Sequence, residues 1–248
     1  MRYLETVMGV PMSIDIRDAG DHDSTAGDAF GELRRADELF SPYRPESELS
    51  QVNRGELAPT GVDALFSEVL VLAERFSAVS GGVFTLRDAE GRLDLNGIVK
   101  GWAAQRAGDL LRSRGIRDFC VNAGGDIVAA GRPAPGRRWQ IGVRSPESAD
   151  QMIAVFALTD ETIATSGSYE RGSHIIDGRT GMPATGLLSV SVIAPDLTTA
   201  DVLATAVYAM GADGVSWAAE RYECAIFAVA DSGEIIDGGD VRRALAIA

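Results

Sequence analysis

The sequence predicts an α+β protein with mixed or antiparallel sheets. Several segments carry apolar residues at three- and four-residue spacing, which is typical of amphipathic helices. Other short runs are rich in β-branched and apolar residues and predict strands. The two kinds of segment follow one another without the regular alternation of a doubly wound parallel fold. With 248 residues, 46% of them apolar, the chain can form one large domain or two small ones.

Each element is predicted from its local pattern. In the segment 24–40, Phe30, Leu33 and Phe40 fall on one helical face. Gly115 ends the helix over 102–114, because glycine readily adopts positive φ. The predicted helical segments are 24–40, a short turn at 47–52, 60–79, 102–114, 199–210 and 213–221. The predicted strands are one or two over 3–16, then 119–121, 127–130, 139–143, 152–158, 174–177, 188–194, 224–230 and 234–236, with a Ser- and Gly-rich turn region at 164–171.

The composition excludes several classes of partner. The chain has 23 basic and 36 acidic residues, a formal net charge of −13. Nonspecific binding to nucleic acid or to an anionic membrane surface needs a basic face, so we expect neither. An anionic ligand must then be held by local positive charge, helix N-termini or a metal ion. The N-terminal residues show no signal-peptide pattern and no stretch approaches transmembrane length, so we expect no stable membrane insertion and a cytoplasmic protein.

Cysteine and histidine usage limits the metal chemistry. Cys120 and Cys224 each lie in an apolar strand-like run and are interpreted as buried thiols. No Cys-x-x-Cys or Cys/His spacing is present, which disfavours a thiolate zinc site. His22 and His174 are the only histidines, too few for a multi-histidine metal centre.

The segment LDLNGIVKGWAAQRAGDLL (93–111) is interpreted as a glycine-containing loop that carries Lys100 and leads into a helix. Backbone N–H groups of such a loop attract an anion, and a lysine strengthens that attraction. The Asn96-Gly97 and Lys100-Gly101 pairs suggest that the backbone closely approaches a ligand. The alternative is a helix-entry turn with an exposed lysine, since the segment is neither a Walker A loop nor a dinucleotide-binding glycine motif.

Asp201 and Thr205 are four residues apart in a predicted helix, so a carboxylate and a hydroxyl share one face. Two such oxygens suit a hard cation such as Mg²⁺, which prefers oxygen ligands and few protein side chains. In the alternative interpretation Thr198 caps the helix and Asp201 completes a capping box.

Three other residues could serve a site or only the structure. His174 can accept a proton at neutral pH, although a lone histidine is often structural. Tyr43 and Phe84 could stack on a planar ring or pack in the core. The stretch 122–126, NAGGD, fits a hairpin turn.

Taken in order, these segments resemble the ApbE-type FAD:protein FMN transferases. The matching segments span nearly the whole chain and are VMGVPMSIDI (7–16), FSPYRPESELSQVN (40–53), SGGVF (80–84), LDLNGIVKGWAAQRA (93–107), FCVNAGGDI (119–127), IATSGSYER (163–171), HIIDGRTGMPA (174–184) and SVSVIAPDLTTADVLATAVYAMG (189–211). The resemblance implies one α+β domain over 1–248, with two packed lobes and FAD in the cleft between them. It also implies an Mg²⁺-dependent transferase that cleaves FAD, attaches FMN to a Thr or Ser hydroxyl of a target flavoprotein and releases AMP.

The resemblance also assigns residues to roles. Metal ligands are implied at Asp201 and Thr205, with a backbone carbonyl at Gly97 or, as an alternative, Val99. His174 matches the base for the acceptor hydroxyl, and Lys100 is expected to neutralise phosphate charge. The implied contacts to FAD are Met8, Tyr43, Val83, Phe84, Thr85, Asp94, Lys100 and Ile175.

The chain departs from the usual family pattern at three positions, which carry Val10, Thr85 and Gly178 in place of the usual Thr, Asp and Pro. Two alternative functions share the same residues. One is an FAD pyrophosphatase, in which water replaces the acceptor hydroxyl and FMN and AMP are released. The other is an FAD-binding protein without catalytic activity.

Overall fold

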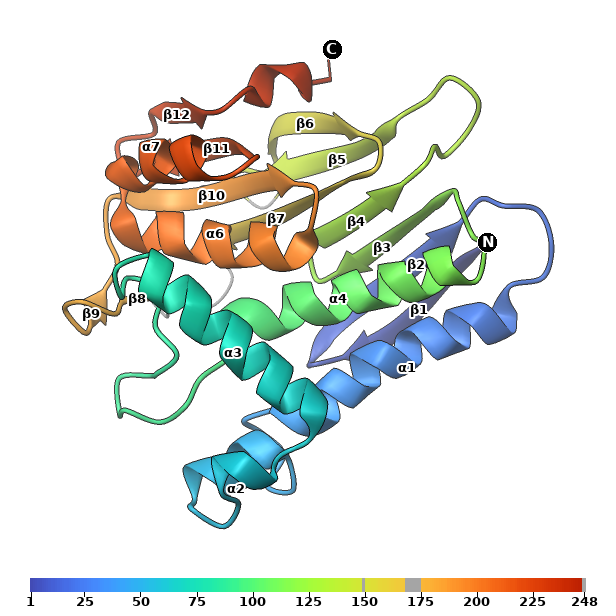
Figure 1. The fold of residues 1–248 in the computed structure, drawn as a ribbon. Helices are drawn as coiled ribbons and strands as arrows, with labels where there is room; N and C mark the ends of the chain where they lie inside the picture. Colours follow the sequence, from blue (N-terminus) through green and yellow to red (C-terminus); the bar gives the residue numbers. More distant parts are fainter. Residues whose placement is uncertain (149, 168–174, 247–248) are drawn as a thin grey trace.

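A computed structural model describes residues 1–148, 150–167 and 175–246. Among these residues, eight strands form one antiparallel sheet in the order β1-β2-β3-β4-β7-β10-β11-β12 (Figure 1). Two further antiparallel pairs, β5–β6 and β8–β9, stand outside this sheet. The predicted α+β class with antiparallel sheets is therefore confirmed.

The strands largely follow the predicted apolar runs. They are β1 (Arg2–Val7), β2 (Val10–Ile16), β3 (Phe119–Ala123), β4 (Asp126–Ala130), β5 (Trp139–Arg144), β6 (Met152–Leu158), β7 (Glu161–Gly167), β8 (Ile176–Asp177), β9 (Met182–Pro183), β10 (Leu187–Ala194), β11 (Ala225–Ala230) and β12 (Ile235–Gly238). The helices are α1 (Asp23–Phe40), α2 (Glu48–Asn53), α3 (Ala64–Val79), α4 (Asn96–Ser113), α6 (Leu197–Met210) and α7 (Ala212–Arg221), with short 3-10 turns at Pro59–Gly61 and Val241–Arg243.

The sheet has two halves, each with its own helices. Strand β1 contacts α1, and β3 and β4 contact α4, whereas β7 and β10 contact α6 and β11 and β12 contact α7; β4 also contacts α6. The halves meet where β4 pairs with β7 and where α4 packs on α6 (Figure 1). The elements beside this seam, α4, α6 and β7, contribute residues to the candidate site.

The β5–β6 hairpin covers the face of the sheet opposite the helices. Its Trp139 and Phe156 form a second apolar cluster with Ile127 of β4 and Phe227 of β11, and the Phe156 and Phe227 rings meet edge to face at 5.8 Å. Strands β4, β10 and β11 therefore lie between two layers. This explains why nearly all of their residues are buried: β11 and β4 after Asp126 are continuous apolar runs, and Ser189 and Ser191 of β10 are buried as well.

Helix α4 begins at Asn96, so the prediction of a loop carrying Lys100 ahead of a helix at 102 is wrong. Lys100 and both neighbouring glycines, Gly97 and Gly101, lie inside the first turns of α4. Glycine has a low helix propensity, which favoured the loop interpretation, but tertiary packing overrides propensity. The turn region predicted at 164–171 is also wrong as far as it is described, because β7 continues to Gly167 through its pairing with β10.

Helix α3 begins with a charged cap. The Oδ1 atom of Asp63 accepts a 2.8 Å hydrogen bond from the Leu65 N–H, and its Oδ2 lies 2.8 Å from Arg35. The backbone hydrogen bond and the Arg35 guanidinium together hold the pKa of Asp63 below its usual value.

Both cysteines are free and partly buried. Burial raises the pKa of Cys120 to about 12 and that of Cys224 to about 11. Thiols held in the protonated form are poor nucleophiles and poor metal ligands. The sequence predicted buried thiols, and the structure gives both residues as partly buried.

Candidate active site

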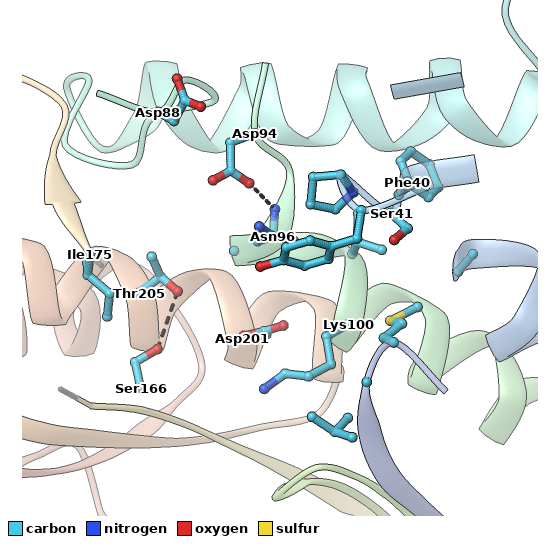
Figure 2. Close-up of a pocket in the computed structure, with 18 of the residues that line it drawn as sticks. Phe40, Ser41, Asp88, Asp94, Asn96, Lys100, Ser166, Ile175, Asp201 and Thr205 are labelled. Atoms are coloured by element: carbon cyan, nitrogen blue, oxygen red, sulfur yellow. Dashed lines mark hydrogen bonds between the residues drawn. The ribbon is translucent and has the colours of Figure 1, made fainter. Parts of the chain in front are cut away.

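A cleft of about 750 Å³ opens at the seam between the two halves of the sheet (Figure 2). Its walls come from the β1–β2 turn, the end of α1 and the loop after it, the segment 84–94, the start of α4, the end of β7, the start of β8 and the face of α6 that carries Asp201 and Thr205. The described lining residues are Met8, Gly9, Val10, Ala36, Asp37, Phe40, Ser41, Pro42, Tyr43, Arg44, Phe84, Thr85, Arg87, Asp88, Asp94, Asn96, Gly97, Val99, Lys100, Thr165, Ser166, Gly167, Ile175, Ile176, Asp201 and Thr205.

Helices α4 and α6 touch where α4 has no side chains. A Cβ atom added to Gly101 would lie 2.6 Å from Asp201 Cβ and 2.8 Å from the carbonyl oxygen of Leu197. A Cβ atom at Gly97 would lie 2.9 Å from the Phe84 ring and 3.4 Å from Thr205 Cγ2. The close approach at these glycines is therefore to other parts of the protein, to α6 at Gly101 and to Phe84 and Thr205 at Gly97, and the predicted approach to a ligand stays a prediction.

Asp201 is fixed in this contact. Its side chain is 5% exposed, and Oδ2 accepts a 2.8 Å hydrogen bond from the Gly101 N–H. In a regular helix the Gly101 N–H would donate its hydrogen bond to the Gly97 carbonyl oxygen. Here Asp201 competes with that carbonyl for the same N–H donor. The capping-box interpretation is wrong, because Asp196 caps α6 by accepting a hydrogen bond from the Thr199 N–H at 2.8 Å.

A third oxygen joins Asp201 and Thr205 from the sheet. Ser166 of β7 places its hydroxyl oxygen 3.3 Å from Thr205 Oγ1 (Figure 2). Within the described residues, no group of three or more His, Cys, Asp or Glu side chains is arranged to hold a metal ion. The available donors are one carboxylate and two hydroxyls, and such an all-oxygen set fits a hard cation such as Mg²⁺ that keeps water or phosphate ligands. Sequence reasoning missed Ser166, which only the β7 register brings to α6.

Lys100 projects from α4 toward the same region of the cleft (Figure 2). Its Nζ atom lies 2.8 Å from Oδ2 of Asp126, the first residue of β4. Asp126 is 1% exposed, and its Oδ1 accepts a 3.1 Å hydrogen bond from the Thr165 N–H. Sequence reasoning assigned no site role to Asp126. The sequence feature that could have identified Asp126 is its position, directly after two glycines and at the start of a strand whose other residues are all apolar.

The residues predicted to contact FAD lie at different depths. Phe84 is 3% exposed and forms part of the inner wall, whereas Tyr43 is 87% exposed at the mouth. Asp94 accepts a 2.9 Å hydrogen bond from the Asn96 N–H at the start of α4 (Figure 2). The other predicted residues in the wall are Met8, Thr85 and Ile175.

Two predicted residues are not in the described wall. Val83 is buried in the core at 1% exposure, and its carbonyl accepts a 2.9 Å hydrogen bond from the Gly178 N–H. His174 lies outside the described residues. Gly178 explains one departure from the family pattern, because a Cβ atom there would lie 2.3 Å from the Gly82 carbonyl oxygen and a proline would lack the donating N–H.

The turn that follows Ile175 and β8 is held by an ion pair. Arg179 Nη2 lies 2.7 Å from Asp177 Oδ2, and the Arg179 N–H donates to Asp177 Oδ1 at 2.9 Å. The Arg179 guanidinium holds the pKa of Asp177 below its usual value. Together with the Gly178 hydrogen bond to Val83, this turn fixes the Ile175 side of the cleft against the Phe84 side.

The described wall carries four carboxylates, at Asp37, Asp88, Asp94 and Asp201, and three basic groups, at Arg44, Arg87 and Lys100. Asp37 pairs with Arg44 at 2.8 Å, and Lys100 pairs with Asp126 behind the wall. Local charge is thus close to balanced and slightly acidic. A diphosphate ligand would therefore gain strongly from a divalent cation bound beside it.

None of the helices in the part of the chain that the structure describes has the length and apolar character needed to cross a bilayer.

Comparison with known proteins relates this arrangement to a family of enzymes. Curated relatives named FAD:protein FMN transferase include one from Treponema pallidum, 39% identical over 144 residues, covering 51% of this chain and 40% of the relative. Another, from Rhodobacter capsulatus, is 32% identical over 196 residues, covering 74% of this chain and 37% of the relative. The chain thus spans about 40% of the length of the curated relatives it matches.

Solved structures share the whole fold. The flavin transferase ApbE from Vibrio cholerae superposes with a TM-score of 0.88 at 23% identity, covering 99% of each chain. The ApbE protein from Thermotoga maritima superposes with a TM-score of 0.83 at 23% identity, covering 100% of this chain and 99% of the other. A family model described as the ApbE family matches residues 8–87 and 85–228, and from this match we conclude that the chain belongs to the ApbE family.

Proposed function

We propose that residues 1–248 act as a single Mg²⁺-dependent FAD:protein FMN transferase domain. The substrate is FAD, and the second substrate is a flavoprotein that presents a Thr or Ser hydroxyl. The observation that carries the proposal is the α4–α6 contact, where Asp201 and Thr205 face the cleft beside Lys100. The names of the curated relatives support the choice of reaction.

The proposed reaction is a phosphoryl transfer. The acceptor oxygen forms a bond to the phosphorus of the FMN half, the bond from that phosphorus to the bridging oxygen breaks, and AMP leaves. In most phosphoryl transfers the protein contributes positioning and charge stabilisation more than covalent chemistry. This requirement agrees with the few polar side chains, Asp201, Thr205 and Lys100, that the packed helices α4 and α6 bring to the cleft.

Each residue has a role in this proposal. Asp201, Thr205 and the Gly97 carbonyl would hold Mg²⁺, which when bound neutralises charge on the phosphates. Ser166 is a further oxygen donor at 3.3 Å from Thr205. Lys100 orients its ammonium toward non-bridging phosphate oxygens. His174 accepts the proton of the acceptor hydroxyl.

The wall of the cleft would hold the two ends of FAD. Phe84 offers a buried ring face for a planar system, and exposed Tyr43 can close over a ligand at the mouth. We assign the remaining contacts to Met8, Thr85, Asp94 and Ile175, which line the same space. Val83 contributes by fixing the Phe84 segment through its hydrogen bond with Gly178.

The test is to mix the protein with FAD, Mg²⁺ and a flavoprotein that carries an accessible threonine. Flavin fluorescence that stays with the acceptor on a denaturing gel is the expected result. Accumulation of free FMN and AMP without labelled acceptor would instead establish an FAD pyrophosphatase. FAD that stays intact with Mg²⁺ present would identify a binding protein without catalytic activity.

A variant tests the metal site directly. Asp201→Asn keeps the shape of the side chain, and we expect it to lose nearly all Mg²⁺-dependent FAD cleavage. Asp213→Asn, an exposed position in the first turn of α7, is the matched control and should keep wild-type activity. Wild-type cleavage by Asp201→Asn at limiting Mg²⁺ would refute the proposed metal site.

A further inference from the structure

We propose that Asp126 is a positioning residue that holds the Lys100 ammonium in place for the reaction. The inference rests on the proposed function, because it explains how Lys100 is oriented toward the phosphates. Asp126 does not line the cleft; it lies behind Lys100, at the first position of β4.

Asp126 occupies the point where the two halves of the sheet separate. On the cleft side, the last residue pair between β4 and β7 is Ile127 with Ile163. Beyond that pair the strands diverge, and the Thr165 N–H donates to the Asp126 side chain at 3.1 Å. The carboxylate therefore continues the connection between the halves where the backbone ladder ends.

The other carboxylate oxygen binds Lys100 of α4. The distance from Nζ to Oδ2 is 2.8 Å, Asp126 is 1% exposed and the Lys100 side chain is 23% exposed. One carboxylate of β4 thus contacts two other elements, α4 through Lys100 and β7 through Thr165. A buried ion pair is weak evidence for stability, and in some proteins such a pair instead serves to specify one geometry.

The function of this pair follows from the chemistry of lysine. A lysine side chain is flexible, and its ammonium is a point charge that can adopt many positions on its four-carbon stem. Phosphoryl transfer depends on charges that are already in place when the reaction occurs. An anchor buried beneath Lys100 supplies this preorganisation without placing another side chain in the cleft.

The pair also has a cost in substrate binding. The Asp126 charge partly cancels the Lys100 charge before FAD arrives, and so weakens attraction of the diphosphate. Removing the Asp126 charge should therefore leave FAD affinity unchanged or tighter, while the chemical step slows. General damage to the fold would weaken both.

The experiment compares Asp126→Asn with Asp118→Asn. Asp118 precedes β3 at the other end of the β3–β4 ladder and also accepts a backbone hydrogen bond, from the Arg132 N–H at 2.7 Å. We expect Asp126→Asn to lower kcat for Mg²⁺-dependent FAD cleavage by up to about 100-fold, the loss expected when a catalytic group is misplaced by about 1 Å. FAD affinity, measured by fluorescence titration without Mg²⁺, should be unchanged or tighter. Asp118→Asn should keep the wild-type kcat.

A double-mutant cycle with Lys100→Met tests whether Asp126 acts through Lys100. In the Lys100→Met background, Asp126→Asn should cause no further loss of kcat, because the group that it positions is gone. Asp126→Glu, which keeps the carboxylate, should retain more activity than Asp126→Asn. An equal loss of kcat in both backgrounds, or a parallel loss of kcat and FAD affinity, would overturn the proposal.

Thermal melting of each variant completes the test. If neither Asp126→Asn nor Asp126→Glu folds, Asp126 is a structural residue and the proposal is wrong. A wild-type protein that leaves FAD intact would refute the proposed function. An active wild type with a fully active Asp126→Asn variant would refute only the role of Asp126.

Discussion

Replacing Gly101 by alanine tests whether the contact between α4 and α6 fixes the site. The new Cβ would lie 2.6 Å from Asp201 Cβ, 2.8 Å from the Leu197 carbonyl oxygen and 2.9 Å from Asp201 Oδ2. Carbon atoms in contact prefer separations of about 3.5–4.0 Å, so the two helices must move apart by roughly 1 Å. The movement would also lengthen the hydrogen bond from the Gly101 N–H to Asp201.

Three energies set the size of the effect. Overpacking a tight core costs about 1–3 kcal/mol, and a hydrogen bond to a charged group contributes about 1.5–3 kcal/mol. Alanine regains about 1 kcal/mol of helix propensity. With the hydrogen bond broken, these energies give a net loss of roughly 1.5–5 kcal/mol. A chain of this size loses about 2–4 °C in Tm per kcal/mol.

The assay measures thermal unfolding and Mg²⁺-dependent FAD cleavage of the same preparations. A 1 Å displacement of Asp201 should slow cleavage by about 100-fold. Gly27→Ala in α1 is the matched control, because a Cβ atom there meets nothing within 4 Å. Gly27→Ala should raise Tm slightly and leave cleavage unchanged. Wild-type Tm and cleavage in Gly101→Ala would refute the argument that this contact positions Asp201.

Two further predictions concern the α3 cap and the Gly178 turn. Asp63→Ala should cost about 1 kcal/mol at pH 7 through loss of the cap. The pKa of Asp63 is lower in the folded state than in the unfolded state. The stabilisation by its charge is therefore complete above the unfolded pKa of about 3.9 and is lost as the pH falls through the folded pKa. The difference in Tm between Asp63→Ala and wild type should narrow toward pH 3, and a constant difference would contradict this. Gly178→Ala should lower Tm and weaken FAD binding in a fluorescence titration, because its Cβ would lie 2.3 Å from the Gly82 carbonyl oxygen; an unchanged Tm would contradict it.

The sequence predicted the elements whose periodicity is local. The pairing of Asp201 with Thr205 on one helix face follows from the helical repeat and needs no tertiary information. Strands β4 and β11 were found because the layer of helices and the β5–β6 hairpin require apolar runs in the strands between them.

The errors arose where tertiary contacts override local preference. Gly97 and Gly101 weaken a helix in isolation, yet α4 includes them because α6 needs their bare backbone. Ser166 was predicted in a turn because its neighbours are small and polar, while the register with β10 holds it in a strand. The ion pair of Asp126 with Lys100 joins residues of different elements, and no local pattern reports such a pair.

The cleft at the β4–β7 seam has two parts with different tolerance to sequence change, a packed floor and an exposed rim. Asp201, Thr205 and Lys100, which we assign to phosphate chemistry, stand on α4 and α6 among many buried residues, where small sequence changes are poorly tolerated. Much of the outer rim, including exposed Tyr43, belongs to turns and loops, which accept substitution and insertion. Exchanging the rim between relatives should therefore redirect which acceptor is modified while leaving the reaction unaltered.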